Sequence, residues 1–199
     1  MSADVSDVID LATPGLRARL RLRHGLLDLS VPPGAAVIVA GDDADDAIGA
    51  LVGRSRRGHV IALDGRRLDR RATDVRVRRG LGYVVDAAVV GDVAVLDHIA
   101  ARAGVRRARA LLADNPLLAG RGGDPAGVLS GGERRMLAWL RCVALRPRAV
   151  VLDRAAAGFD TRAVEWAGAQ VAAWRGGGVA VVVRPGRPEE AAWAGPLLA

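Results

Sequence analysis

The 199-residue sequence contains no lysine, so all 29 of its lysine-or-arginine positions are arginine. The absence of this one residue type excludes every chemistry that depends on a lysine amine. It rules out the lysine that binds phosphate in a P-loop, a Schiff-base lysine and a Ser-x-x-Lys nucleophile pair. These exclusions hold whatever fold the chain adopts, because they depend on composition alone.

Cysteine and aromatic residues are also scarce. Cys142 is the single cysteine, which excludes an intrachain disulfide and a cysteine-rich metal site and fits a reducing compartment. Aromatic residues make up 3% of the chain, so platforms for stacking nucleic-acid bases are few. The net charge is +7, but the arginines are scattered along the chain, and charge alone does not specify a partner. We therefore expect no specific nucleic-acid partner.

Targeting and membrane-spanning patterns are missing from the sequence as well. The first eleven residues carry Asp4, Asp7 and Asp10 and no basic segment, which is not the pattern of a signal peptide. No apolar run approaches the roughly 20 residues of a membrane-spanning helix. We expect a cytoplasmic protein whose contact with a membrane comes through a partner.

Half of the sequence is hydrophobic, and this apolar half is arranged as alternating strands and helices. Such alternation favours an α/β fold with a largely parallel sheet. Asp64-Gly65 after residues 59–63 indicates a tight turn. We expect strands over residues 16–23, 35–40, 59–63, 81–85, 149–152 and 179–183, and helices over residues 47–52, 92–113, 130–145, 161–174 and 188–193.

The most specific motif lies at the start of the helix expected over residues 130–145. Ser130 is a plausible N-cap, and Glu133 three residues later completes a capping box. The helix opens with Leu129-Ser130-Gly131-Gly132-Glu133, and a buried strand that ends in Asp153 comes after the helix. A turn with Asp160 follows the strand. In this order and at this spacing, the segment resembles the nucleotide-binding domain of ATP-binding cassette (ABC) transporters.

The resemblance extends over most of the chain and implies a single domain, residues 1–199. The implied fold is that of a P-loop-type ABC ATPase, with a mostly parallel sheet core, an antiparallel β lobe and a helical subdomain at about residues 87–146. In this family two domains pair head to tail, and the signature at a helix N-terminus contacts the γ-phosphate of ATP held on the opposite domain. Backbone N–H groups at a helix N-terminus suit such an anion. The signature residues here are Ser130, Gly131, Gly132 and Glu133, and Asp160 falls in the family's D-loop.

The Walker A loop of the family does not match. Two of its glycines are lost, the lysine position is Ala47 and the position of the hydroxyl that binds Mg²⁺ is Ile48. Carboxylates in and beside the loop would repel a phosphate, since like charges about 4 Å apart repel by roughly 4 kcal/mol at an effective dielectric constant of 20. We therefore expect no nucleotide at this loop. The residues at the Walker A positions are Gly41, Asp42, Asp43, Ala44, Asp45, Asp46, Ala47 and Ile48.

Other catalytic positions depart from the family too. Asp153 keeps the Walker B aspartate, but the next residue, a catalytic glutamate in the family, is Arg154, which has no acceptor and cannot act as a base. Asp86 stands at the Q-loop glutamine position, and the switch histidine falls near Pro185. We expect no catalytic residue and no resident metal. We further expect Arg154 to pair with an aspartate of the acidic loop, Asp43, Asp45 or Asp46, and to fill the empty site.

The sequence therefore favours an ATP-binding-type subunit of an ABC transporter that is catalytically degenerate. Such a subunit would pair as a heterodimer with a complete ABC ATPase and couple to a transmembrane permease at the inner face of the cell membrane. ATP with Mg²⁺ would bind only at the composite site with the partner. The alternatives are a stand-alone pseudo-ATPase that acts as a scaffold or regulator, an acidic-loop metal-dependent enzyme and an arginine-rich nucleic-acid binder.

Overall fold

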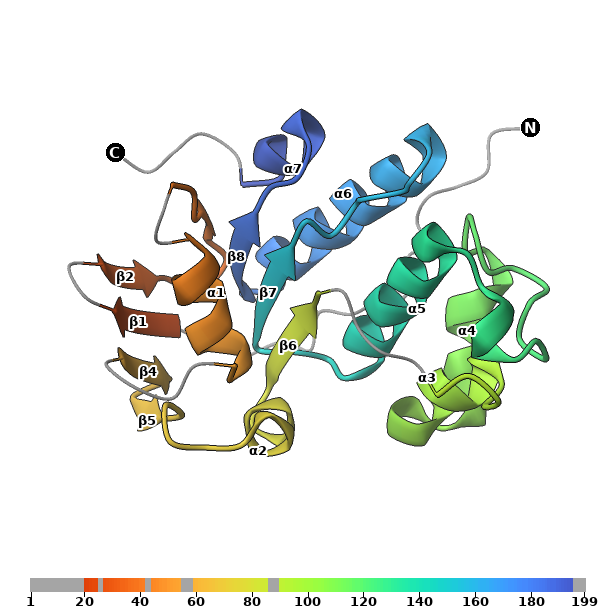
Figure 1. The fold of residues 1–199 in the computed structure, drawn as a ribbon, viewed down its shortest axis with the longest axis horizontal. Coiled ribbons are helices and arrows are strands. Elements are labelled where there is room, and N and C mark those ends of the chain that lie inside the picture. The colour runs from red at the N-terminus through yellow and green to blue at the C-terminus, as the bar shows by residue number, and fades with distance from the viewer. Residues whose placement is uncertain (1–19, 25–26, 42–43, 55–58, 86–89, 195–199) are drawn as a thin grey trace.

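The computed structural model describes residues 20–24, 27–41, 44–54, 59–85 and 90–194 of the chain. Two sheets and seven α-helices lie within these ranges (Figure 1). None of the helices in this part of the chain is both long and apolar enough to cross a membrane.

The core of the molecule is a four-stranded parallel sheet. Its strands run in the order β3, β8, β7, β6, so β8 lies between β3 and β7. β7 and β8 are rich in valine and buried, as expected of parallel strands covered on both faces. The strand bounds are β3 Ala36–Ile38, β6 Leu81–Val84, β7 Ala149–Asp153 and β8 Ala180–Arg184.

A second, antiparallel sheet has the strand order β2, β1, β4, β5. The two residues between β4 and β5, Asp64 and Gly65, have φ values of 50° and 75°, as a two-residue hairpin turn requires. The predicted tight turn at Asp64-Gly65 is thus confirmed. The strand bounds are β1 Leu20–His24, β2 Leu27–Val31, β4 His59–Leu63 and β5 Arg66–Arg67.

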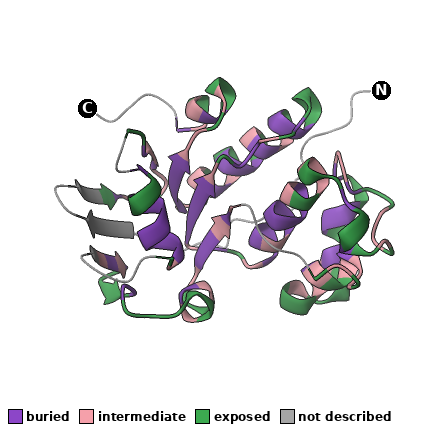
Figure 2. Cartoon of the chain, viewed as in Figure 1, coloured by how far each residue is buried: buried purple, intermediate pink, exposed green. Residues whose placement is uncertain are grey.

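The helices divide between the two faces of the parallel sheet. Figure 1 shows α1 between the two sheets, and α3, α4 and α5 on the far side of the parallel sheet from the antiparallel one. Buried residues concentrate in the parallel strands and on the helix faces turned toward them (Figure 2). The bounds are α1 Ala44–Val52, α2 Thr73–Arg78, α3 Val95–Ala103, α4 Val105–Ala113, α5 Gly131–Ala144, α6 Thr161–Gly176 and α7 Pro188–Ala192, with a 3₁₀ turn at Ala126–Val128.

Two hydrophobic clusters fill the interior, one on each face of the parallel sheet. The cluster on the α5 and α6 face contains the tryptophans, with Trp139 stacked on Trp174 at 5.5 Å between ring centroids. Trp166 and Trp193 meet Trp139 edge-on. The cluster on the other face contains α1, whose Ala47 and Ile48 side chains are almost wholly buried.

The predicted fold class is confirmed, with three local differences. The helix expected over 47–52 begins three residues earlier, at Ala44. The helical pattern over 92–113 is two helices, because Gly104 between them has a φ of 76° that no α-helix contains. Neither β2, β5 nor α2 was predicted from the sequence.

Candidate functional site

The carboxyl ends of β3, β8 and β7 lie side by side, which is the usual place for a ligand in an open α/β sheet. The β3 chain continues through Gly41 into α1, while Asp153 ends β7 and Arg184 ends β8. A cavity of about 210 Å³ opens at this edge, smaller than the roughly 300–1,000 Å³ of small-molecule sites. Its lining residues are Val39, Ala40, Gly41, Ala44, Asp45, Arg154, Arg184 and Pro185.

Arg184 connects both sides of this cavity. Its Nη1 atom donates a hydrogen bond to Oδ1 of Asp45 at the start of α1. Its Nε atom lies 2.9 Å from Oδ1 of Asp153, and both of these side chains are 11% exposed. The second contact is an ion pair without hydrogen-bond geometry. One guanidinium thus contacts two carboxylates, one at the start of α1 and one at the end of β7.

Of the three predicted partners of Arg154, Asp45 pairs with Arg184 instead. Arg184 belongs to β8, the strand between β3 and β7, so its side chain reaches α1 directly. Arg154 is exposed, has a φ of 48°, and packs its stem against Gly186. Asp43, another predicted partner of Arg154, lies outside the described residues together with Asp42.

The charge of Arg184 also governs the protonation of its exposed partner. The hydrogen bond from Arg184, followed by the attraction of its positive charge, lowers the pKa of Asp45 below its ordinary value. Arg154 and Arg54 add smaller attractions in the same direction. Asp45 is therefore charged at neutral pH, and its negative charge faces the positive charges of Arg184 and Arg154 in the same cavity.

The positions matched to the Walker A loop are mostly part of α1. The amide of Ala44 donates to the carbonyl of Gly41 at 3.1 Å, and Ala44 is the first residue of α1. Ala47 and Ile48 face the core, with 0% and 1% exposure. Asp46 is exposed on the helix surface. The positions of the family's lysine and hydroxyl therefore hold side chains that pack against the sheet.

The predicted capping box at the start of α5 is confirmed. Ser130 accepts from the amide of Glu133 at 3.3 Å, and Glu133 accepts from the amide of Ser130 at 2.8 Å. Arg121 pairs with Glu133 and with Asp124. Burial raises the pKa of Glu133, but the hydrogen bonds from Ser130 and the charge of Arg121 outweigh it, and the net pKa is lowered. The carboxylate therefore stays charged at the helix N-terminus, a favourable position for it.

The two signature glycines have different surroundings. A Cβ atom on Gly132 would come within 2.5 Å of the carbonyl oxygen of Gly158, so the close approach of α5 to the turn after β7 requires glycine there. A Cβ atom on Gly131 would meet no atom within 4 Å. Gly131 and Ser130 are exposed. Packing within the chain explains the glycine at 132 and does not explain the one at 131.

The turn after β7, residues 154–160, is held by side chains that the sequence analysis did not single out. Arg135 and Trp139 of α5 donate to the carbonyls of Ala157 at 2.7 Å and Ala155 at 2.9 Å. Arg187 donates to the carbonyl of Phe159 at 2.8 Å. Each of these side chains donates to a main-chain carbonyl that is distant in the sequence. No local motif encodes such contacts, so the sequence carries no signal for them.

Glu190 of α7 completes the anchoring of this turn. It is fully buried and accepts from the amide of Ala156 and, at 2.6 Å, from that of Gly186. Asp160, the residue predicted to lie in the D-loop, ends the turn as the N-cap of α6 and accepts from the amide of Ala163 at 2.8 Å. The turn therefore connects the N-terminal ends of α5 and α6 rigidly.

Two further expectations concern the Q-loop position and metal binding. Asp86, matched to the Q-loop glutamine, lies outside the described residues. Within the described ranges, no three histidine, cysteine or acidic side chains are grouped so as to hold a metal ion. Pro185, at the position of the switch histidine, lines the cavity beside Arg184.

The sequence matches no protein-family model and no curated protein. The fold, in contrast, is similar to solved ATP-binding cassettes. An ATP-binding subunit of an ABC transporter has 18% identity and a TM-score of 0.70 over 84% of this chain and 79% of its own. A nucleotide-free cassette from an ABC transporter has 14% identity and a TM-score of 0.67, covering 85% and 82%.

A third similar structure is longer than this chain. It is a bacterial Atm1-family ABC exporter with ATP bound, with 20% identity and a TM-score of 0.69. The match covers 88% of this chain but only 36% of the exporter. At such identities the likeness shows the fold alone: the chain has the fold of an ABC-transporter ATP-binding cassette.

Proposed function

We propose that this chain is an ATP-binding-type subunit of an ABC transporter that holds no nucleotide at its own loop. It would lend Ser130, Gly131, Gly132 and Glu133 to ATP bound by a complete partner ATPase. The observation that carries the proposal is the position of Arg184, whose guanidinium links Asp45 at the start of α1 to Asp153 at the end of β7.

The Arg184 bridge opposes nucleotide binding in two ways. A phosphate entering the cavity would compete with Asp45 and Asp153 for Arg184, and a Mg²⁺ ion drawn to Asp153 meets the positive charge of Arg184. Displacing Arg184 would leave its charge and that of the largely buried Asp153 uncompensated, which is costly in a protein interior. The buried Ala47 and Ile48 offer no replacement for a phosphate-binding lysine or a metal-binding hydroxyl.

The signature end of α5, in contrast, is open to a partner. Ser130 and Gly131 are exposed at the N-terminus of a 14-residue helix. Such an end favours anions through its free N–H groups and its positive dipole. Gly131 leaves room for a ligand to approach the main chain, a feature that packing within the chain does not explain.

The rest of the assignment follows from this arrangement. ATP with Mg²⁺ would bind only at the composite site, and the partner ATPase would form a heterodimer with this chain on a transmembrane permease. The protein would then be cytoplasmic and peripheral to the inner face of the cell membrane. The domain would span residues 1–199, with a helical subdomain at about 87–146.

One observation favours a second candidate, a stand-alone pseudo-ATPase that acts as a scaffold. Ser130, Glu133 and Asp160 all serve as helix caps, so their presence can be explained by stability alone. Under this alternative the signature would contact no ATP.

Two measurements test the proposal. Calorimetry on the purified chain at concentrations that detect millimolar affinity is expected to show no binding of MgATP. Micromolar binding would contradict the proposal that the chain holds no nucleotide at its own loop. The complex purified from native membranes through a tag on this chain is then expected to contain an ABC ATPase and a permease and to hydrolyse ATP.

The hydrolysis assay separates the two candidates. Gly131→Arg places a bulky cation at the exposed signature and is expected to abolish ATP hydrolysis by the complex. Gly176→Arg is the matched control, because Gly176 also lies in a helix with no atom within 4 Å of an added Cβ. Unchanged hydrolysis in the Gly131→Arg complex would support the scaffold.

A further inference from the structure

A positively charged pocket lies at the end of the parallel sheet opposite the candidate site. It is a pocket of about 380 Å³, within the range of small-molecule sites. Gly80 and Arg148, which line it, immediately precede β6 and β7, whereas Asp153 and Arg184 end β7 and β8. Because these strands are parallel, the two sites are separated by the length of the sheet.

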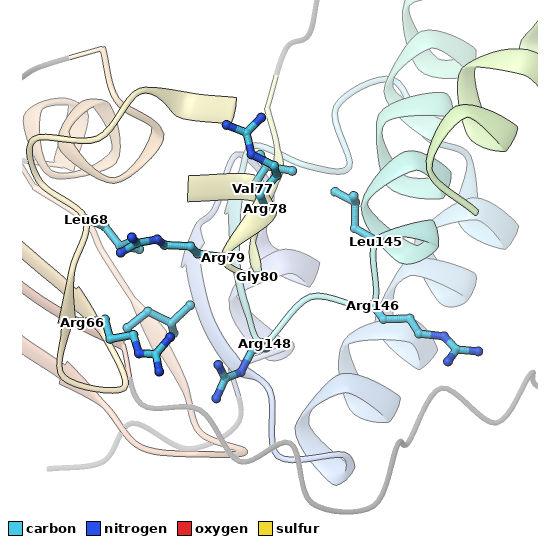
Figure 3. A pocket seen from close by; sticks show the side chains of 10 residues that line it. Arg66, Leu68, Val77, Arg78, Arg79, Gly80, Leu145, Arg146 and Arg148 are labelled. Carbon is cyan, nitrogen blue, oxygen red and sulfur yellow. The ribbon is translucent and has the colours of Figure 1, made fainter. Parts of the chain in front are cut away.

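Arginine dominates the wall of this pocket (Figure 3). Five of its ten lining residues are arginine, and none of those ten is acidic. Figure 3 shows the side chains of Arg78 and Arg146 pointing away from the other three. The inner arginines are Arg66, Arg79 and Arg148.

The chain holds Arg148 in place from both ends. A Cβ atom on Gly80 would lie 2.8 Å from Cγ of Arg148, so the arginine stem lies directly over the glycine main chain. Two amides, those of Arg148 and Ala149, donate to the carbonyl of Gly80 at 2.8 and 3.1 Å. The guanidinium pairs with Asp64 in the β4–β5 turn. A side chain positioned in this way loses little freedom when it binds a ligand.

Arg148 retains capacity for another acceptor. Its side chain is 36% exposed, and among the described residues its ion pair with Asp64 uses only the Nη2 atom. Arg79, on the pocket wall, makes only a long 3.5 Å contact with the carbonyl of Arg67. Arg66 is exposed on the short strand β5. Donors are thus available on three elements that meet at the pocket.

The floor of the pocket is apolar. Leu63 and Leu68 are 3% and 0% exposed, and Val77 and Leu145 are partly buried beside them. A hydrophobic floor below arginine side chains fits a ligand with an apolar part and a strongly anionic end. Arginine favours phosphate in particular, because its planar guanidinium can donate two parallel hydrogen bonds to it.

We propose that this pocket binds the phosphate or pyrophosphate group of a small amphiphilic molecule, through Arg66, Arg79 and Arg148. The site is independent of the proposed ATP-dependent function, since it lies at the opposite edge of the sheet and uses none of the same residues. The same phosphate chemistry is offered by a soluble phosphorylated compound and by an anionic lipid headgroup.

Calorimetry with inorganic pyrophosphate tests the soluble form of the ligand. Saturable binding at one site per chain is expected, with at least a tenfold loss of affinity in Arg79→Gln and in Arg148→Gln. Arg109→Gln, an exposed arginine on α4, is the matched control and is expected to bind like the wild type. Arg79 is exposed and holds no ion pair among the described residues, so Arg79→Gln leaves the packing of Arg148 against Gly80 undisturbed.

Asp64→Asn provides a change in the opposite direction. Asparagine is accepted in a two-residue hairpin turn, so the turn is retained while the carboxylate that competes for Arg148 is removed. Pyrophosphate binding is expected to tighten several-fold in this variant. Weaker binding in Asp64→Asn would contradict a site built on Arg148.

Sedimentation with vesicles of phosphatidylcholine and phosphatidylglycerol in equal amounts tests the lipid form. Vesicle binding lost in Arg79→Gln, without pyrophosphate binding, would assign the phosphate to a headgroup. Binding of neither probe would overturn the proposal. Pyrophosphate binding that is lost in Gly131→Arg but kept in Arg79→Gln would also overturn the proposal, because the pyrophosphate would then bind at the signature. Binding of single-stranded DNA that Arg109→Gln weakens as much as Arg79→Gln would instead indicate a general attraction of polyanions.

Discussion

Asp153 and Arg184 are register partners in the adjacent strands β7 and β8, and their charged atoms lie 2.9 Å apart. The arginine reaches beyond this neighbour to Asp45 at the first turn of α1. A single side chain thus ties together the carboxyl ends of the central strands and the helix that follows β3. Arg184 and Asp45 both line the cavity at this edge of the sheet.

We predict that Arg184→Gln raises the pKa of Asp45 to near the ordinary 3.8, because its main hydrogen bond and attraction are removed. In the wild type the folded-state pKa is lowered, so the pair stabilises the fold above the unfolded pKa and loses this effect as pH falls through the folded one. Titration of the Asp45 carboxyl carbon by NMR measures the change. An unchanged midpoint in Arg184→Gln would show that Arg184 does not hold Asp45 in solution. Arg109→Gln is the control and should leave the pKa of Asp45 unaltered.

A second prediction concerns Arg76, which is fully buried beneath α1. Its guanidinium donates to the carbonyls of Ala50 at 2.5 Å and Leu51 at 2.8 Å, and to that of Asp69 at 3.0 Å. Ala50 and Leu51 lie in the last turn of α1, where carbonyls lose their intrahelical partners, and Asp69 precedes α2. The carbonyl of Ala50 also accepts from the amide of Gly53 at 3.2 Å. Arg76→Met should destabilise the protein by about 3 kcal/mol in urea unfolding, because buried carbonyls lose charged donors.

Arg78→Met is the control for this prediction. Arg78 lies two residues further along the same helix and pairs with Asp74, with both side chains more than half exposed. Exposed pairs of this kind contribute about 0.3–0.5 kcal/mol. Equal loss of stability in the two variants would contradict a capping role for Arg76.

Much of the fold could be predicted because its signals are local. The valine-rich runs that became β7 and β8, and the Asp64-Gly65 turn, each reveal their structure within a few residues. The β5 strand has only two residues, and α2 only six, so neither is long enough for its pattern to repeat recognisably. The start of α1 was missed because its first turn is acidic and was read as a loop.

The candidate site was predictable only in part. The capping box of Ser130 and Glu133 depends on a fixed spacing along one segment, and the sequence shows it directly. The partner of Asp45 depends on the order of the strands in the sheet. No local pattern in the sequence shows that β8, and not β7, is the neighbour of β3. That is why Arg154 was predicted where Arg184 lies.

A third prediction separates the two signature glycines. Gly132→Ala should destabilise the fold by about 1–3 kcal/mol, because its Cβ would press on the carbonyl of Gly158 and the main chain there must move. Gly131→Ala should leave stability within about 0.5 kcal/mol of the wild type, because its Cβ enters open space. Thermal and urea unfolding of the two variants measure the difference. Equal destabilisation would mean that the helix N-terminus needs glycine for reasons other than the contact with Gly158.

The last prediction concerns Glu190, which holds the turn after β7 from the side of α7. Its two oxygens accept from the amides of Ala156 and Gly186, and the side chain is fully buried. In Glu190→Gln one of these amides would face an NH₂ group and lose its acceptor, which should destabilise the protein by about 1–3 kcal/mol. Hydrogen exchange should show faster opening at Ala156, in the turn between β7 and α6, or at Gly186, which follows β8. Glu189→Gln, at a half-exposed neighbouring residue, is the matched control. If Glu190→Gln leaves the hydrogen-exchange protection of Ala156 and Gly186 unchanged, the anchoring role is refuted.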